Sequence, residues 1–340
     1  MEYKLLGVRT SPFINIGDYI QALASSQFYP KIDGFIQREE LKEYTGEKVV
    51  IIMNGWYMHN PVHWPPSDSI IPLFVAFHIN TSVKEQMLSD ESIQYLKKHE
   101  PIGCRDLFTV DCLKSKGIDA YFSGCMTLTL GHKYKSATRN NKIYFVDPYV
   151  LVNRNPLSFL PKMPYLLKKL KKISRISKKW YGGLTVQGIV KSTLFLQTYS
   201  QLFDEELLVS SEFVSQAGVS GWPKDDEVLL NKAEDLVKKF SKAGLVITSR
   251  IHCALPCLGM ETPVLFTTAK NMSEFSACRF GGLKDLFNVI EYDKGLLKPK
   301  FKMTGKLNLE NHPENKTEWR HLANDLIKRC TIFFSMLENE

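Results

Sequence analysis

An α/β fold built on parallel sheets is predicted by three features of this 340-residue sequence. Short runs of valine, isoleucine and leucine alternate with segments in which apolar residues recur at helical spacing, which is the pattern of a doubly wound sheet. The runs are apolar at consecutive positions, as expected of strands that are buried on both faces. The length corresponds to about two domains of ordinary size. In folds of this class, ligands bind beyond the carboxyl ends of the strands.

The first half of the chain shows this alternation from its start. Strands are predicted at 4–8, 48–53, 70–77, 101–104 and 119–122. Helices are predicted at 16–28, 89–99 and 105–117, and the last of these ends at a glycine, as many helices do. A polar, basic stretch at 132–141 separates this half from the next strand, so we predict a first domain over residues 1–138.

The second half continues the pattern with a helical insertion. Strands are predicted at 142–147, 245–248, 263–266 and 286–292, and helices at 164–180, 184–203, 205–213, 227–243, 251–260 and 317–337. We predict a second domain over 139–316 that includes a basic amphipathic helix at 162–180. The remaining residues, 317–340, are predicted to form a helix that could cross back to the first domain.

The composition predicts a globular protein without a membrane span. Apolar residues make up 44% of the sequence and charged residues 24%. No run of about eighteen apolar residues is present, and the first ten residues lack the apolar core of a signal peptide. The seven cysteines are scattered and lack the spacing of a zinc site. We therefore expect a cytoplasmic protein, and its charge suggests the inner face of the membrane as an alternative place of action.

The net charge of +8 comes from one segment. Residues 148–203 contain ten lysines and arginines and no acid, so 8 − 10 leaves the rest of the chain at −2. Within this segment, apolar residues of 164–180 recur at helical spacing and lysines fill most other positions. We predict that this helix contacts an anionic membrane surface or a pyrophosphate. The alternative is a helix that packs its apolar stripe on the protein and leaves its lysines in water.

The stretch from 245 to 266 combines a strand, a helix start and two chemically active side chains. Ser249 is predicted to cap the helix, so Arg250 and His252 lie at its N-terminus, where backbone N–H groups favour an anion. A guanidinium can bind phosphate or carboxylate through two donors, and histidine titrates near neutral pH. This spacing fits a site for a small, multiply charged anion. It fits about equally well an arginine that pairs with a carboxylate in the core and a histidine that is satisfied at a helix start.

Two other strand-to-helix junctions supply candidate residues. Asn15, Gly17 and Asp18 follow the first strand, and the glycine permits a close approach of a ligand or backbone. Asp18 could cap the helix or bind a substrate hydroxyl, and capping is the commoner role for an acid there. Arg105 stands at a junction in the middle of the chain, where it could instead pair with Asp106.

An aromatic, proline-rich loop follows the strand at 48–53. Trp56 and Tyr57 could stack on a sugar, and the alternative is a packed surface loop. His59 and His63 are four residues apart, but the proline between them argues against a helix that would present both to a metal. No metal site is therefore predicted.

In their order and spacing, three motifs resemble the polysaccharide pyruvyl transferase family. They are Asn15-Ile16-Gly17-Asp18, Pro101-Ile102-Gly103-Cys104-Arg105-Asp106, and Ser249-Arg250-Ile251-His252 followed by Gly259, Pro263 and Lys270. The likeness extends from about residue 12 to residue 290. Members of the family are similar to GT-B glycosyltransferases, so the resemblance implies two Rossmann-like domains facing a cleft.

The resemblance implies an enzyme that moves the enolpyruvyl unit of phosphoenolpyruvate onto a sugar of a polysaccharide or glycan precursor and forms a pyruvate ketal. It implies that Arg105 and Arg250 bind the donor. His252 would then be the acid–base catalyst, and Asp18 would act on the acceptor side. His78 lies where many members carry a glycine-rich stretch and is a second candidate catalytic histidine. The other candidate substrate-binding residues are Ser249, Asn15, Gly17, Lys270, Trp56 and Tyr57.

Phosphoenolpyruvate carries about three negative charges, so two arginines and a helix N-terminus suit it, and the reaction calls for no cofactor. The sugar acceptor could be linked to a lipid pyrophosphate, which would agree with membrane contact by residues 162–180. The alternatives are a GT-B glycosyltransferase that uses a nucleotide sugar, and a noncatalytic protein that binds polyanions or membrane surfaces. Nucleic acid is not expected as a partner, because the basic helix lacks an aromatic platform for base stacking.

Overall fold

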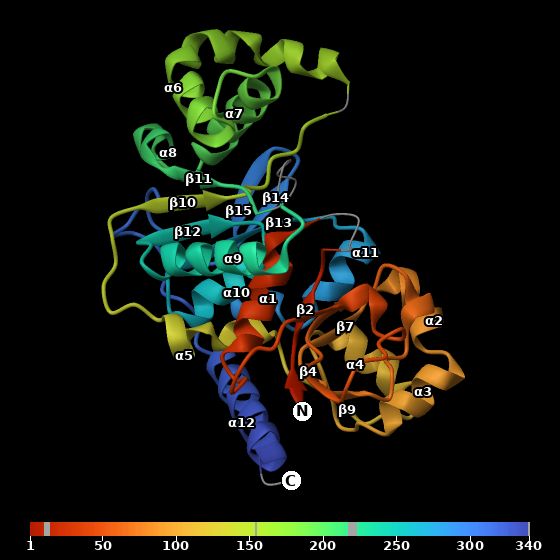
Figure 1. The fold of residues 1–340 in the computed structure, drawn as a ribbon. Coiled ribbons are helices and arrows are strands. Elements are labelled where there is room, and N and C mark those ends of the chain that lie inside the picture. Colours follow the sequence, from red (N-terminus) through yellow and green to blue (C-terminus); the bar gives the residue numbers. More distant parts are fainter. Residues whose placement is uncertain (10–13, 154, 217–222, 339–340) are drawn as a thin grey trace.

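The computed structural model describes residues 1–9, 14–153, 155–216 and 223–338, and it confirms an α/β fold with parallel sheets. Figure 1 shows most of the N-terminal strands and helices on one side of the molecule and a larger sheet with its helices beside them. Helix α1 (Ile16–Ser26) belongs to the N-terminal part of the chain but packs against helices of the larger sheet.

The N-terminal strands are short, and all of their pairings are parallel. They form three small sheets with the strand orders β1-β4-β6, β2-β3 and β5-β7-β8-β9. Their bounds are β1 Glu2–Tyr3, β2 Leu5–Gly7, β3 Phe35–Gln37, β4 Val49–Ile52, β5 Gly55–Tyr57, β6 Ile70–Leu73, β7 Phe77–Ile79, β8 Ile102–Cys104 and β9 Ala120–Phe122. The strand predicted at 70–77 is two strands, because Ala76 has a φ of 55° that interrupts the extended backbone.

Short helices and turns connect these strands or follow the last of them. They are α2 Lys84–Met87, α3 Asp90–Lys97, α4 Leu107–Lys114 and α5 Gly131–Tyr134, with the 3-10 turns η1 Arg38–Glu40, η2 Pro61–His63, η3 Thr81–Val83 and η4 Met126–Leu130. Asp106 caps α4, because its Oδ1 accepts a hydrogen bond from the backbone N of Thr109 at 2.9 Å. The cap fixes the position of this acid at the carboxyl end of β8.

The larger sheet has the strand order β11-β10-β12-β13-β14-β15. Its strands are β10 Ile143–Val146, β11 Glu212–Val214, β12 Leu245–Thr248, β13 Val264–Ala269, β14 Asn288–Asp293 and β15 Leu296–Pro299. All are parallel except β15 at the edge. Numbered within the sheet, the parallel strands run 2-1-3-4-5, the order of a flavodoxin-like doubly wound sheet. The crevice at the carboxyl ends of β10 and β12 is therefore the topological switch point, where such sheets bind ligands.

Helices cover both faces of the larger sheet (Figure 1). On one face, Phe145 and Ile247 pack among α6 Met163–Tyr181, α7 Val186–Tyr199 and α8 Glu205–Ser210. On the other face, Tyr144 and Val246 pack among α9 Asp226–Ser241 and α10 Ile251–Gly259. The remaining elements are η5 Pro156–Lys162, α11 Glu274–Ala277, η6 Cys278–Phe280, η7 Lys284–Leu286 and α12 Trp319–Glu338.

None of the described helices combines the length and the apolar character that crossing a lipid bilayer requires.

One buried apolar cluster spans the two halves of the chain. It contains Ile16 of α1, Val237 of α9 and Leu255 of α10. Helix α12 packs on η4, and the ring of its Phe334 lies 5.0 Å from the ring of Tyr29. The C-terminal helix thus contacts residues near the start of the chain, while the domain boundaries at 138/139 and 316/317 stay predictions.

Two elements of the larger sheet differ from prediction. The helix predicted at 205–213 ends at Ser210, and its last residues belong to the edge strand β11. The strand β15 lies within a segment that we expected to be an irregular connection. Both strands are only three or four residues long and occupy or adjoin an edge of the sheet, so their apolar pattern is too brief to identify.

Helix α10 approaches η4 so closely that Gly259 has no room for a side chain. A Cβ atom there would overlap the carbonyl oxygen of Leu128. We expect Gly259→Ala to lower the free energy of unfolding by about 1–3 kcal/mol, because the helix or η4 must shift. The matched control is Gly183→Ala, since a Cβ at Gly183 meets no atom within 4 Å. Urea denaturation of both variants measures the difference, and equal stabilities would contradict this account of the packing.

Candidate active site

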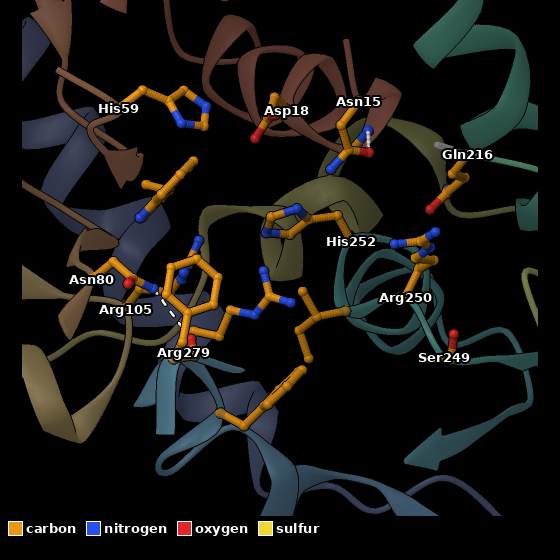
Figure 2. A pocket seen from close by; sticks show the side chains of 15 residues that line it. Asn15, Asp18, His59, Asn80, Arg105, Gln216, Ser249, Arg250, His252 and Arg279 are labelled. Carbon is orange, nitrogen blue, oxygen red and sulfur yellow. Dashed lines mark hydrogen bonds between the residues drawn. The ribbon is translucent and has the colours of Figure 1, made fainter. Parts of the chain in front are cut away.

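A cavity of about 250 Å³ opens at the switch point of the larger sheet, and residues of the N-terminal half also line it (Figure 2). Most of the predicted site residues come together there, namely Asn15, Gly17, Asp18, Trp56, Arg105, Ser249, Arg250 and His252. The other lining residues were not predicted as site residues, and they are His59, Asn80, Gln216, Ile251, Phe275, Arg279 and Phe280.

Asp147, directly after β10, ties together the loops at the switch point. Its φ of 40° lies in the left-handed region and turns the chain off the strand. Its Oδ2 accepts hydrogen bonds from Nε of Arg250 at 2.8 Å and from the backbone N of Gln216 at 3.0 Å. Its carbonyl oxygen accepts a third bond from Oγ of Ser249 at 2.6 Å. One residue thus connects the segments that follow β10, β11 and β12.

The start of α10 differs from the predicted capping. Arg250 occupies the N-cap position, and no side-chain hydrogen bond caps the helix. Ser249 is not the cap, because its hydroxyl donates to the carbonyl oxygen of Asp147. The backbone N of Arg250 donates to Oγ1 of Thr248 at 2.9 Å. The side chain of Arg250 is therefore oriented by Asp147 and not by the helix.

His252 extends into the cavity from the first turn of α10 (Figure 2). Gly17 allows this close packing, because a Cβ there would lie 3.1 Å from Cβ and 3.2 Å from Nδ1 of His252. The Nε2 atom is buried and has no hydrogen-bond partner among the residues that the structure describes. Burial, followed by the positive charges of Arg105 and Arg279, holds the pKa of His252 well below its usual 6.5. The imidazole is therefore neutral at pH 7.

The first turn of α1 contributes Asn15 and Asp18. Asn15 is the cap, since its Oδ1 accepts a hydrogen bond from the backbone N of Gly17 at 3.0 Å. Asp18 does not cap the helix, although capping is the commoner role for an acid at this position. Its Oδ1 accepts a bond from Nε2 of Gln21 at 3.1 Å and lies 3.8 Å from Nη1 of Arg38. Asp18 thus places a carboxylate in the wall of a cavity that is rich in arginine.

Arg105 is almost fully buried, and its Nε has no hydrogen-bond partner in the described part of the chain. The neighbouring Asp106 is engaged by His78, whose Nδ1 lies 2.5 Å from Oδ2 of the acid. Both of those side chains are fully buried, and His78 does not line the cavity. Burial, followed by the charge of Arg105, lowers the pKa of His78 to about 4. His78 therefore acts on Asp106 as a neutral hydrogen-bond donor.

Arg279 lines the cavity but was not predicted as a site residue. It lies in η6, on the connection between β13 and β14. Figure 2 shows Arg279 and Arg105 on one side of His252 and Arg250 on the other side. Burial, followed by the charge of Arg105, lowers the pKa of Arg279. The available signal was a basic residue in a loop at the carboxyl end of a parallel strand.

Residues of the N-terminal half hold the segment that carries Arg279. Nδ2 of Asn80 donates a hydrogen bond to the carbonyl oxygen of Phe275 at 3.2 Å. The backbone N of Leu107 donates to the carbonyl oxygen of Gly281 at 3.2 Å. The segment thus connects two strands of the larger sheet, but its hydrogen bonds attach it to the N-terminal half.

Trp56 and His59 form an aromatic part of the cavity wall. Their ring centroids are 4.2 Å apart at an angle of 89°, and the guanidinium carbon of Arg38 lies 5.7 Å from the Trp56 ring. Nε1 of Trp56 is buried and lacks a hydrogen-bond partner among the described residues. This wall therefore combines a ring face with an unused N–H donor.

Two predicted substrate-binding residues do not line the cavity. Tyr57 is fully buried and packs on Phe77, so its ring has no free face for a sugar, contrary to the prediction. It follows Trp56 on β5, and successive side chains of a strand point to opposite faces. Lys270 is exposed, and its Nζ lies 3.5 Å from Oδ2 of Asp293.

The positive groups of the cavity exceed the negative ones. Asp147 balances Arg250, whereas Arg279 has no carboxylate within 4.0 Å among the described residues. Asp106 lies 3.9 Å from Nε of Arg105 but is already engaged by His78. An anion with several charged oxygens would satisfy these guanidinium groups through charge-assisted hydrogen bonds. The site is thus suited to a small polyanion held beside a neutral imidazole.

The described residues include no group of three or more His, Cys, Asp and Glu side chains that could hold a metal ion. Nδ1 of His63 lies 2.6 Å from Oε1 of Glu43, away from the cavity.

The model of the polysaccharide pyruvyl transferase family matches residues 15–271, about three quarters of the 340-residue chain. The matched segment includes Asp18, Arg105, Arg250 and His252 and ends before Arg279. No curated protein and no solved structure matches the chain.

The low pKa of His78 predicts a stability that depends on pH. In the unfolded chain the imidazole has its usual pKa of 6.5, so His78 binds a proton more readily there than in the folded chain. The contribution of neutral His78 to the free energy of unfolding is therefore complete above pH 6.5 and is lost as the pH falls toward about 4. Between pH 7 and pH 5 the loss is on the order of 2 kcal/mol.

Urea denaturation at both pH values measures this loss. His78→Asn should reduce the pH dependence, because the amide can replace the Nδ1–H donor to Asp106 but does not titrate. His321→Asn, on the exposed face of α12, is the control that should behave like the wild type. An unchanged pH dependence in His78→Asn would contradict the assignment.

Proposed function

The chain belongs to the polysaccharide pyruvyl transferase family, and from this premise we propose that phosphoenolpyruvate is its donor. The enolpyruvyl unit would pass to a sugar of a polysaccharide or glycan precursor and close a pyruvate ketal across two hydroxyls. The observation that carries the proposal is the cavity in which Arg105, Arg250 and Arg279 surround His252. Phosphoenolpyruvate combines a phosphate and a carboxylate on a three-carbon unit, which matches the size and charge of this cavity.

We further propose a GT-B-like arrangement in which two Rossmann-like units face a cleft. Its support is the 2-1-3-4-5 strand order of the larger sheet and the contribution of both halves to one cavity. In this arrangement the first unit, residues 1–138, supplies the acceptor side. The second unit, residues 139–316, supplies the switch-point loops, and the C-terminal helix would cross back to the first unit.

The arginines would divide the charges of the donor among them. Arg250 is held by Asp147 through Nε, which leaves its two terminal nitrogens free to grip one anionic group as a fork. Arg105 and Arg279 lie on the opposite side of His252 and would bind the other group. As the phosphate leaves, its growing charge is stabilised by guanidinium groups that are already in place. His78 would be a positioning residue that holds Asp106 next to Arg105.

The acceptor would lie toward Asp18, with the Trp56 ring as a surface for the sugar. A first hydroxyl oxygen bonds to the central carbon of phosphoenolpyruvate while a proton is added to the methylene carbon. A second hydroxyl oxygen then bonds to the same carbon, and the bond to the phosphate oxygen breaks. Each hydroxyl gives up one proton, so one proton remains on the carbon and one leaves with phosphate. His252 and Asp18 are the groups that could carry these protons.

Calorimetric titration with phosphoenolpyruvate, beside UDP- and GDP-sugars, tests the donor. Of these donors, we expect only phosphoenolpyruvate to bind. Arg279→Gln should weaken the affinity for phosphoenolpyruvate by roughly 10-fold to 100-fold, because charge-assisted hydrogen bonds are lost. Arg320→Gln is the matched control, because this arginine pairs with Glu261 outside the cavity. Binding of a nucleotide sugar in place of phosphoenolpyruvate would move the protein to the glycosyltransferases.

Donor binding should also change the protonation of His252. A bound polyanion offsets the arginine charges that, after burial, depress the pKa of this imidazole, so the pKa rises and binding is accompanied by proton uptake at a pH between the pKa values of the free and the bound protein. Titrations in buffers of different ionisation enthalpy measure that proton. His252→Asn should take up fewer protons than the wild type, and His321→Asn should match the wild type. Equal uptake in all three proteins would remove His252 from the site.

A further inference from the structure

The helices α6 and α7 lie at the end of the molecule opposite α12 (Figure 1). The segment of η5 and α6 carries an exposed apolar row. Half of the exposed large hydrophobic side chains in the described part of the chain lie between residues 151 and 186. We define the row by its members in η5 and α6, which are Leu157, Leu160, Met163, Leu167 and Leu170. Leu157 and Leu167 each leave 67% of their surface exposed. Large side chains gathered in this way mark an interaction surface.

The row is separate from the apolar stripe that fixes α6 to the protein. Leu166, Ile173 and Ile176 are buried against the larger sheet and α7. With about 100° between residues, Met163, Leu167 and Leu170 occupy an arc of about 60° beside that stripe. The helix therefore needs only one of its two apolar surfaces for folding.

The basic residues of α6 also divide into two groups. One group serves the fold, since Nζ of Lys169 and Nζ of Lys172 each lie 2.7 Å from Oε2 of Glu205, and Lys179 donates to the carbonyl oxygen of Ser210 at 2.7 Å. The other group consists of Arg175 and the lysines Lys168, Lys171 and Lys178, which have no ion pair or hydrogen bond within the described chain. On the helix these four residues follow the apolar row over the next arc of about 80°.

We infer that the apolar row and these three lysines form a docking surface for an anionic lipid bilayer. Leucine side chains beside unpaired lysines match the boundary between acyl chains and anionic headgroups. A second copy of this chain would bring the same lysines together, which is unfavourable. A nucleic acid would match the lysines but would leave the leucines in water.

The docking surface and the cavity are linked along the chain. Asp147, which orients Arg250, is followed by residues 148–155 and then by η5. The loop that leaves the carboxyl end of β10 at Asp147 therefore leads directly into the part of the chain that a bilayer would contact. The inference does not rest on the proposed reaction, since it uses no residue of the cavity.

Vesicle flotation of the purified full chain tests the docking surface. We expect binding to phosphatidylcholine vesicles with about a third phosphatidylglycerol at about 0.1 M salt, and little binding to pure phosphatidylcholine. The apolar variant is Leu160→Gln with Leu167→Gln, and the basic variant is Lys168→Gln, Lys171→Gln and Lys178→Gln. Each should weaken binding by at least about tenfold. All five side chains are exposed, so the fold should be retained.

Matched controls remove the same groups from other surfaces. Leu296→Gln with Ile332→Gln removes two exposed apolar side chains, and Lys97→Gln with Lys114→Gln and Lys116→Gln removes three exposed lysines. Both controls should bind anionic vesicles like the wild type. The inference would be overturned if the wild type did not bind anionic vesicles, or if the controls lost as much binding as the variants. Full binding by the apolar variant would also overturn it and would indicate a site for polyanions. A wild-type oligomer that the apolar variant disrupts, without vesicle binding, would assign the row to a second copy.

Discussion

The hydrogen bonds of Asp147 are the constraint on which the site depends. A parallel sheet brings the ends of its strands to one edge, but it does not determine how the following loops meet. Here a single residue in the left-handed region joins three of those loops and fixes Arg250 by its Nε. This hydrogen bond uses Nε of the guanidinium and leaves the two terminal nitrogens to bind a ligand. The same residue thus joins the loops of the switch point and orients Arg250 at the cavity.

A second constraint is the close packing of α1 on α10. Gly17 has only a hydrogen atom where it meets His252, so a helix of the N-terminal half lies directly on the imidazole. The imidazole is buried by this contact and stands among arginines, and both effects favour its neutral form. A negative ligand would reverse part of that effect. The occupancy of the cavity and the proton affinity of His252 are therefore coupled by simple electrostatics.

The sequence predicts the fold class and most of the cavity, because both depend on patterns within short segments. Consecutive apolar residues identify the inner strands of the larger sheet, and strand-to-helix junctions identify Arg105, Arg250 and His252. Contacts between distant segments are not predicted in this way. Asp147 matters through its backbone turn, and Arg279 enters the cavity because Asn80 holds its segment in place. Tyr57 was misplaced because alternation along β5 admits only one of two adjacent rings to the cavity.

The attachment of Arg279 has a mechanical consequence. Its segment leaves and rejoins the larger sheet, yet Asn80 and Leu107 bind it to the N-terminal half. Arg250 is anchored to the larger sheet itself through Asp147. If the two halves hinge apart, Arg279 and Arg105 travel with one half and Arg250 with the other. Opening would thus separate the arginines that line the cavity, so it would weaken the binding of an anion as well as expose the anion to solvent.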